Sequence, residues 1–115
     1  MSVLLNAILS VAPAIRYVAI LREGKLESFQ RPGLTDASAG ESDRYEELFV
    51  NPTILTAAAQ RGNLDCGGLR YVLIRYGNFF QVIVPTVWGH ASICFEPTSM
   101  PLDHVEQICR IIEED

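Results

Sequence analysis

The second half of the chain contains three strand patterns separated by very short turns, which restricts the fold more than any other feature. Residues 69–85 read LRYVLIRYGNFFQVIVP, and Gly77-Asn78 between two apolar runs is typical of a tight hairpin turn. A Trp88-Gly89 turn then leads to a third apolar run. We predict a meander of strands at Leu69–Tyr76, Phe79–Val84 and Ala91–Glu96.

The first half contains a helix and a hairpin. Residues Val3–Val11 place apolar side chains at near-helical spacing, and Pro13 ends the pattern. Ile15–Leu21 is apolar on both faces, as an internal strand is. Glu23-Gly24 supplies the turn to Lys25–Arg31, whose charges suit an exposed sheet edge.

The middle of the chain predicts a loop and a helical region. Pro32–Asp43 reads as a loop, and Ser42 can cap a helix over Tyr45–Val50. Asn51-Pro52 has the pattern of an N-cap followed by a first-turn proline, and Gly62 closes the helix that follows. The region is therefore either two helices or one kinked helix. Gly67-Gly68 then permits the turn into the meander.

The order of elements indicates an α+β fold. A final helix at Pro101–Glu114 carries one apolar face, formed by Leu102, Val105, Ile108, Cys109 and Ile112. Layer packing then predicts a five-stranded antiparallel sheet with helices on both faces. The residues leave open which end of the meander joins the first hairpin. If the third strand joins it, Leu69–Tyr76 is an internal strand.

Composition narrows the function classes. The chain has 115 residues, a net charge of −5 and three cysteines, and its length predicts one domain over residues 1–115. An acidic chain without a Lys/Arg cluster argues against nucleic acid and anionic membranes as partners. No basic segment precedes the first apolar residues, so we expect no secretory signal. Sparse, unpaired cysteines indicate reduced thiols in the cytoplasm.

No residue pattern predicts catalysis, a metal site or a cofactor. Cys94, Cys109, His90 and His104 lack the spacing of a nucleophile with its base or of a metal site. No glycine-rich phosphate loop is present, so the chain is not itself a GTPase. We expect structural thiols and a protein that is not an enzyme.

Three stretches resemble the roadblock/dynein-light-chain family. VAPAIRYVAILREGKLES is similar to the family's helix end, first strand, glycine turn and second strand. LRYVLIRYGNFFQVIVP resembles its third and fourth strands, and HASICFEPTSMPLDHVEQICRII its fifth strand and final helix. Together they cover about half of the chain. The chain departs from the family where Asn51-Pro52 interrupts a middle helix that is usually long and continuous.

The resemblance implies a sheet order of 2-1-5-4-3, with the third strand at an edge. Family members pair this edge into a ten-stranded dimer sheet. They are non-catalytic scaffolds or regulators, and they often act on small Ras-like GTPases. The resemblance therefore implies a homodimer with a Ras-like GTPase as a candidate partner.

The third strand is complementary to a second, antiparallel copy of itself. Centred on Leu73, the pairing opposes arginine to tyrosine and apolar to apolar side chains, with no like charges facing each other. The facing pairs are Arg70 with Tyr76, Tyr71 with Arg75, and Val72 with Ile74. The predicted dimer interface comprises Arg70, Tyr71, Val72, Leu73, Ile74, Arg75 and Tyr76 of the strand with Thr56, Ala59 and Gln60 of the middle helix.

The sequence also offers a candidate surface for a partner protein and an alternative fold family. Glu46 and Glu47, with Trp88 in a turn, form a candidate partner surface, whereas a solvated acidic face and a packed tryptophan are the alternatives. The element order also fits a sensory module resembling the PAS family. Such a module would hold a small ligand between the middle helices and the sheet, and a solid core under Leu55, Ala58 and Ala59 argues against it.

Overall fold

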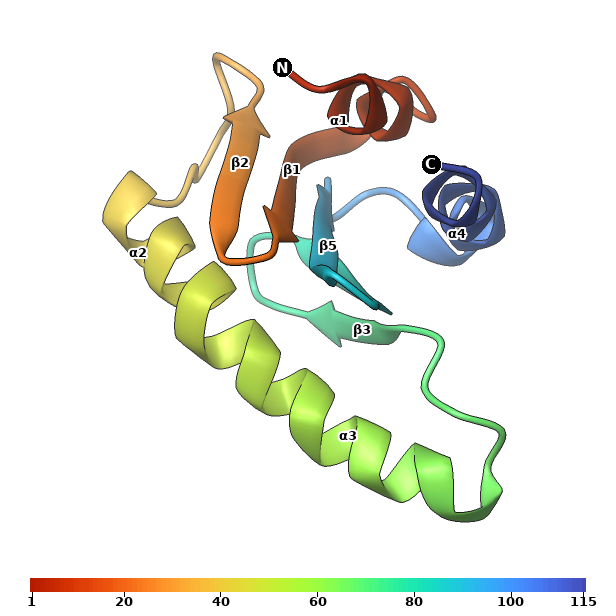
Figure 1. Cartoon of the computed structure of the whole chain (residues 1–115). Helices are drawn as coiled ribbons and strands as arrows, with labels where there is room; N and C mark the ends of the chain where they lie inside the picture. Colours follow the sequence, from red (N-terminus) through yellow and green to blue (C-terminus); the bar gives the residue numbers. More distant parts are fainter.

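The computed structural model describes residues 1–115 and contains one antiparallel sheet of five strands in the order β2-β1-β5-β4-β3 (Figure 1). The strands are β1 (Ile15–Arg22), β2 (Lys25–Gln30), β3 (Val72–Arg75), β4 (Phe80–Thr86) and β5 (Gly89–Phe95). The helices are α1 (Val3–Leu9), α2 (Gly40–Tyr45), α3 (Asn51–Asp65) and α4 (Val105–Glu113), with a π turn at Glu46–Val50 and a 3-10 turn at Pro101–Asp103.

The strand order confirms the predicted fold class. The first hairpin joins the meander through β5, which pairs with both β1 and β4. Attachment through the third strand, the open alternative, is therefore wrong. Strands β2 and β3 are the two edges of the sheet.

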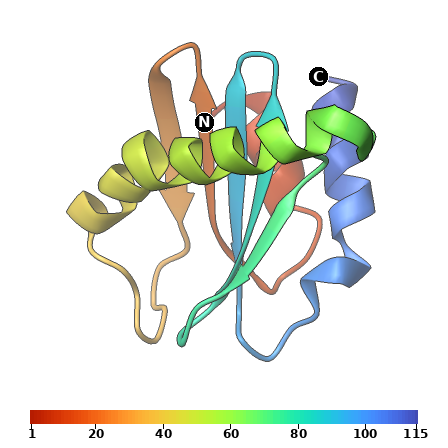
Figure 2. The same cartoon turned by 90° about the horizontal axis from the view of Figure 1, so that it is seen from below.

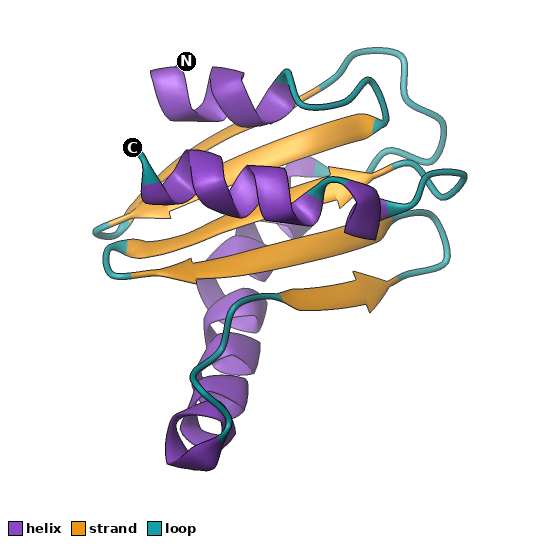
Figure 3. Ribbon diagram, turned by 90° about the vertical axis from the view of Figure 1, so that its right-hand side faces the viewer, coloured by secondary structure: helices purple, strands orange, loops and turns teal.

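One face of the sheet carries the main hydrophobic core. The strand register aligns Val18, Ile93, Val82 and Leu73 in one row across four strands. Helices α1 and α4 lie side by side over this face (Figure 3). Leu5, Ile8 and Ile108 of these helices are fully buried against the strands. Burying aliphatic side chains is the dominant favourable term in folding, so this layer stabilises the fold.

The opposite face is more polar and lies under the middle helical segment, which comprises α2, the π turn and α3. The row on this face is Tyr17, Cys94, Gln81 and Ile74. Figure 2 shows the segment crossing in front of the strands. Of the residues in α2, none is buried, and α3 buries only Asn51, Leu55 and Gly62. The segment is therefore held to the sheet by few residues.

The middle helical segment is one continuous helix with a π turn, which corrects several sequence predictions. It starts at Gly40, inside the predicted loop Pro32–Asp43, and its N-cap is Ala39 rather than Ser42. Asn51 has helical dihedral angles, φ −63° and ψ −45°, so it is not an N-cap. Its N–H donates to the carbonyl of Glu46, five residues earlier.

The π turn has a physical cause in Pro52. A proline inside an α-helix lacks the N–H for the regular hydrogen bond, and its ring clashes with the carbonyl four residues before it. A π turn, which closes hydrogen bonds over five residues, is one of the known accommodations of such a site. The helix thus bulges at Glu46–Val50 and continues, instead of stopping and restarting.

The prediction that Gly62 ends the helix is wrong. Gly62 instead allows the chain to return close beside the helix. The helix continues to Asp65, and the N–H groups of Cys66 and Gly68 both donate to the Gly62 carbonyl. A Cβ atom on Gly62 would lie 3.1 Å from the carbonyl carbon of Gly68. Gly67 and Gly68 have φ of 82° and 90°, which confirms their predicted role in the turn.

Strand β3 is shorter than the predicted Leu69–Tyr76 because of Pro85. Val72 pairs with Ile83, so continuing the ladder would place Arg70 opposite Pro85. The N–H of Tyr76 donates to the carbonyl of Phe79. This bond fixes which residues of β3 form backbone hydrogen bonds with β4. In that alternation Pro85 would have to donate an N–H toward Arg70, and proline has none. The ladder therefore ends at Val72.

Other boundaries shift by a few residues. Helix α1 ends at Leu9 rather than Val11, and the last helix begins with the 3-10 turn before α4. The β4–β5 turn consists of Val87 and Trp88, because Gly89 already belongs to β5. No helix is both long enough and apolar enough to span a bilayer.

Gly89 is the glycine whose replacement we expect to cost most. Its φ is 149°, and a Cβ atom there would lie 2.0 Å from the backbone carbonyl oxygen of Leu21 on the neighbouring strand. We expect Gly89→Ala to lower the free energy of unfolding by about 3 kcal/mol or more, through clash and backbone strain. Gly77→Ala is the control, because a Cβ atom there meets nothing within 4 Å. Urea unfolding measures both, and equal stabilities would contradict the expectation.

Candidate functional site

The β3 edge and the end of α3 form a surface that the chain leaves uncovered. Because Tyr76 bonds to Phe79, the alternation along β3 directs the backbone N–H and C=O of Leu73 and Arg75 away from β4. None of these backbone groups has a partner outside the strand pairs. Helix α3 extends past this edge of the sheet (Figure 3), so its far half has no strand beneath it.

The exposed side of α3 is nearly free of charge. A shallow groove of about 460 Å³ runs along it and includes the predicted interface residues Thr56 and Gln60. Ala59 is half-buried. Phe49 borders the groove and is 61% exposed, with its ring 5.5 Å from that of Tyr45. Uncharged helix surfaces with exposed aromatic rings are typical of protein contacts.

The two arginines of the third strand are paired within the chain. Arg70 donates two hydrogen bonds of 2.9 Å to the Glu106 carboxylate on α4. These hydrogen bonds lower the pKa of Glu106. Arg75 lies over the ring of Phe80, 4.8 Å from its centroid, and donates to the carbonyls of Tyr76 and Gly77. Both arginines therefore have partners within one copy of the chain.

Tyr76 is also engaged within the chain, because its hydroxyl donates to the Glu46 carboxylate at 3.3 Å. A stack of Arg70 on Tyr76 of a second copy would compete with both intrachain contacts. Tyr71, Val72, Leu73 and Ile74 are half-buried instead, and they keep apolar surface available at the edge.

Glu47 lies in the interior and joins the middle helical segment to the sheet. It is fully buried, so it does not belong to the exposed partner surface predicted for it. Its Oε1 lies 2.8 Å from His90 Nε2 and accepts from Asn51 Nδ2 at 2.9 Å. Its Oε2 accepts from the Tyr17 hydroxyl at 3.3 Å. One carboxylate therefore links the π turn to β1, β5 and the start of α3.

The sequence contains one signal of this cluster. His90, Ser92 and Cys94 alternate along β5, which places three polar or polarisable side chains on one face. Gln81 adds a fourth, and its amide donates to the Ser92 hydroxyl at 2.8 Å. A sheet face with so many buried polar groups requires a polar helix above it.

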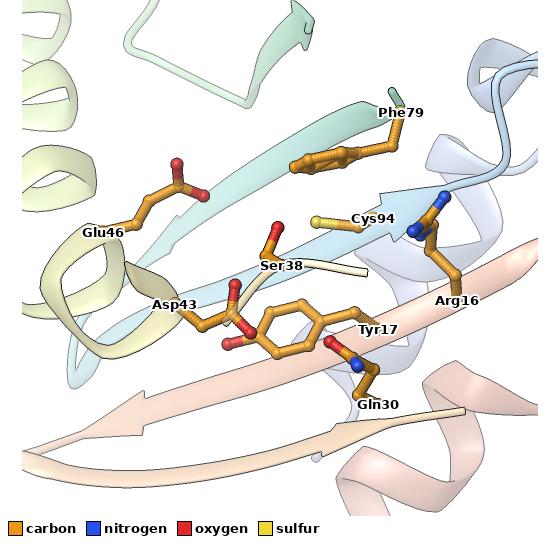
Figure 4. Close-up of a pocket in the computed structure, with 8 residues that line it drawn as sticks. All are labelled: Arg16, Tyr17, Gln30, Ser38, Asp43, Glu46, Phe79 and Cys94. Carbon is orange, nitrogen blue, oxygen red and sulfur yellow. The ribbon is translucent and has the colours of Figure 1, made fainter. Parts of the chain in front are cut away.

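Two further carboxylates, Asp43 and Glu46, face the same layer. Figure 4 shows them pointing from the helical segment toward Tyr17 and Cys94 of the sheet. Burial raises the pKa of Asp43 and of Glu46, and the charge of Glu47 raises both further. Neither carboxylate forms an ion pair. The acidic residues are thus split between a buried anchor, Glu47, and two half-buried neighbours.

The pocket that Asp43 and Glu46 line against the sheet is too small to hold an organic ligand. The enclosed pocket in Figure 4 has about 10 Å³ of free space, which is room for about one water molecule. Leu55 is buried and Ala58 and Ala59 are half-buried. This pocket is too small for the ligand of a PAS-like sensory module, and the larger hollow beside α2 is an open groove at the sheet edge.

The thiols and Trp88 have structural environments. Burial raises the pKa of Cys94 and of Cys109, which disfavours the reactive thiolate. Cys66 is exposed beside Asp65. Trp88 is half-buried at the border of the main core, and Arg22 lies over its ring, 4.3 Å from the centroid. No group of His, Cys, Asp and Glu side chains is arranged to hold a metal ion.

We expect Glu47→Ala to destabilise the fold by about 3–5 kcal/mol, because it leaves buried donors on His90, Asn51 and Tyr17 without an acceptor. Glu41→Ala, on the exposed α2 helix, is the matched control and should change stability by about 0.5 kcal/mol or less. Chemical unfolding of both variants measures the difference. A loss from Glu47→Ala as small as that of the control would contradict the anchoring role.

Asp43 provides a test with pH. Its raised folded pKa means that ionisation costs more in the folded chain than in the unfolded chain. The cost is present above the folded pKa and vanishes below the unfolded value of about 4. We expect Asp43→Asn to raise the free energy of unfolding at about pH 7 and to match the wild type at about pH 3.5. Urea unfolding at both pH values measures this, and a variant that is less stable at neutral pH would refute it.

Comparison with known proteins gives matches at the level of structure. No family model and no curated protein sequence matches the chain. A Roadblock/LC7 domain from Streptomyces avermitilis superposes with a TM-score of 0.71 and 8% identity, over 99% of this chain and 92% of that one.

Two MglB structures are also similar. The gliding protein MglB of Thermus thermophilus gives a TM-score of 0.61 and 17% identity, over 97% of this chain and 87% of its own. MglB in a tetrameric arrangement gives 0.59 and 16%, over 96% and 86%. The element order, the sheet order and these superpositions agree, and the chain has the roadblock/LC7 fold.

Proposed function

We propose that the chain is a single roadblock-like domain that forms a homodimer and acts as a non-enzymatic scaffold or regulator, with a small Ras-like GTPase as its partner. One observation supports the dimer above the others. The helix α3 extends beyond an edge strand whose outward backbone groups have no partner. A second copy placed at this edge covers both features at once.

The backbone directions along β3 fit the predicted two-fold register. Leu73 points its N–H and C=O outward, so an antiparallel second copy centred on Leu73 exchanges both hydrogen bonds with it. Val72 then faces Ile74 of the second copy. The overhanging half of each α3 lies over the partner's sheet, where Thr56, Ala59 and Gln60 meet the other helix. The two copies therefore contact each other through the same surface, as a two-fold axis requires.

Energetically, apolar contact stabilises the seam more than the arginines do. Fully covering an aliphatic side chain contributes about 1.5–3 kcal/mol, and symmetry doubles each such contribution. Association costs several kcal/mol or more in lost freedom, so the seam needs several of these side chains together. Arg70 and Tyr76 already have intrachain partners. We therefore assign the seam to Val72, Leu73, Ile74 and the backbone.

The proposed regulatory role rests on the family resemblance and on the fold. Similar structures include a gliding protein and a tetrameric arrangement of MglB, which supports assembly as part of the function. Glu46 and Trp88 are half-buried and Val87 is exposed, so they leave some surface for a partner, whereas Glu47 is fully buried. We place the protein in the cytoplasm, in keeping with its free thiols.

The dimer predicts a sharp effect of one substitution. We expect Leu73→Pro to weaken self-association by about a hundredfold or more, because it removes an outward N–H that β4 does not use. Sedimentation at micromolar concentration measures this. Ser28→Pro, which removes an outward N–H from the opposite edge, is the matched control and should remain a dimer. A wild-type protein that is monomeric at micromolar concentration would refute the proposed dimer.

The GTPase role requires a partner experiment. The tagged wild-type chain and Leu73→Pro are incubated with lysate of the source cell, with GDP or a non-hydrolysable GTP analogue. We expect mass spectrometry to find a Ras-like GTPase with the wild type and to find it at least about tenfold depleted with the variant. Recovery without any GTPase would refute the partner class. Equal recovery by both forms would refute the need for the dimer.

A further inference from the structure

The other edge of the sheet, β2, also has free backbone groups. The N–H of Arg31 donates to the carbonyl of Arg16 at 2.9 Å just beyond the strand, and this fixes the alternation along the hairpin. Leu26, Ser28 and Gln30 therefore direct their N–H and C=O groups away from β1. Strand β2 pairs only with β1. These outward groups form a row of three donors and three acceptors.

The same three residues also form the floor of a groove. Their side chains lie on the sheet face under the middle helical segment, because they alternate with Glu27 and Phe29. Helix α2 stands beside β2 (Figure 1) and supplies the opposite wall. The groove measures about 390 Å³, within the usual range of ligand sites. Its lining residues include Tyr17, Leu26, Ser28, Gln30, Asp43 and Arg44.

Asp43 and Arg44 are the charged residues that line the groove, and the helical segment around them carries more acids than bases. Over Gly40–Glu46 the chain carries Glu41, Asp43 and Glu46 against one base, Arg44. Asp43 lines the groove and has no hydrogen bond or ion pair to a cation, and Figure 4 shows its carboxylate beside the ring of Tyr17. Burial and the charge of Glu47 raise the pKa of Asp43, as expected for a carboxylate without a cationic partner.

We propose that the groove between β2 and α2 binds an extended basic peptide segment of a partner protein, which adds a strand to the β2 edge and places an arginine or lysine side chain against Asp43. The backbone of the peptide pairs with Leu26, Ser28 and Gln30. Alternate side chains of the peptide enter the groove, because successive residues of a strand point to opposite faces. The main-chain hydrogen bonds provide affinity for the peptide, and the side-chain contacts in the groove provide specificity for its sequence.

A second copy of the chain is a poor occupant of this edge. Two β2 strands related by a two-fold axis would bring two α2 helices, each with the same excess of acidic groups, to opposite sides of one seam. Like charges facing each other at a desolvated contact oppose association. A small molecule would leave the row of outward backbone groups unpaired. A basic, extended chain satisfies the charge and the backbone together.

The site lies at the edge opposite to the β3 seam, so it does not depend on the dimer. The β2 and β3 strands are separated by three others in the sheet. Leu73→Pro is therefore expected to bind the same peptide with unchanged affinity. This separates the test of the groove from the test of the proposed function.

Two synthetic heptapeptides test the site in solution. The first is acetyl-Ser-Arg-Thr-Val-Ser-Arg-Thr-amide, and the second has glutamate at both arginine positions. Each is titrated into the full-length, isotopically labelled chain, and amide chemical shifts are followed. We expect the largest shifts at Leu26, Ser28 and Gln30, and binding of the basic peptide about tenfold or more tighter than the acidic one.

Two pairs of variants locate the contacts. Ser28→Pro removes an outward N–H while Ser28→Ala keeps it, so we expect about tenfold or greater loss of binding only with proline. Asp43→Asn keeps every backbone hydrogen bond, so the variant is expected to fold. It should remove the preference for the basic peptide. Glu41→Gln, also on α2 but outside the groove, should keep the preference.

Several results would overturn the proposal. Shifts that cluster away from β2, or that are absent at millimolar peptide, would refute the groove as the binding site. Equal binding of the basic and acidic peptides would refute the role of Asp43. Equal binding by Ser28→Pro and Ser28→Ala, both folded by circular dichroism, would refute strand addition.

Discussion

The position of the middle helical segment depends on one buried carboxylate. Glu47 accepts from Asn51 and Tyr17 and lies 2.8 Å from His90, and it is fully buried while doing so. A buried charged or polar group is tolerated only with such partners, so the pairing fixes where the π turn sits on the sheet. The overhang of α3 and the groove beside α2 are both consequences of that position. The same segment contributes few apolar side chains of its own to the interior.

The two faces of the sheet therefore have different physical roles. The face under α1 and α4 is a conventional apolar core, with Leu5, Ile8, Ile93 and Phe95 fully buried. The opposite face carries hydrogen-bonded polar groups, and its covering helix leaves much of its own surface to solvent. Stability is concentrated in the first layer. The second layer presents the edges and grooves through which the chain can meet other molecules.

The strands follow from the residue pattern and their order from the family resemblance, whereas the details of the site are visible only in the structure. Short turns at Glu23-Gly24 and Gly77-Asn78, with apolar runs between them, predict the hairpin and the meander, and the resemblance supplies the edge position of β3. The π turn is not predictable from local patterns, because Asn51-Pro52 fits a helix start equally well. Glu47 looks like any other acid of a solvated run, and only the packing against His90 reveals it. The partner of Arg70 is Glu106, 36 residues away in the sequence, and local patterns do not predict such a pair.

Pro85 has a consequence for how many molecules can gather on one sheet. Free sheet edges template further strands, and long, flat edges lead to open-ended aggregates. Because Pro85 has no N–H to donate, the β3 ladder ends at Val72, and the turn after Arg75 ends it on the other side. The edge can therefore offer only a short, finite run of backbone groups. A residue of the neighbouring strand thus sets the length of the edge that β3 presents to a second molecule.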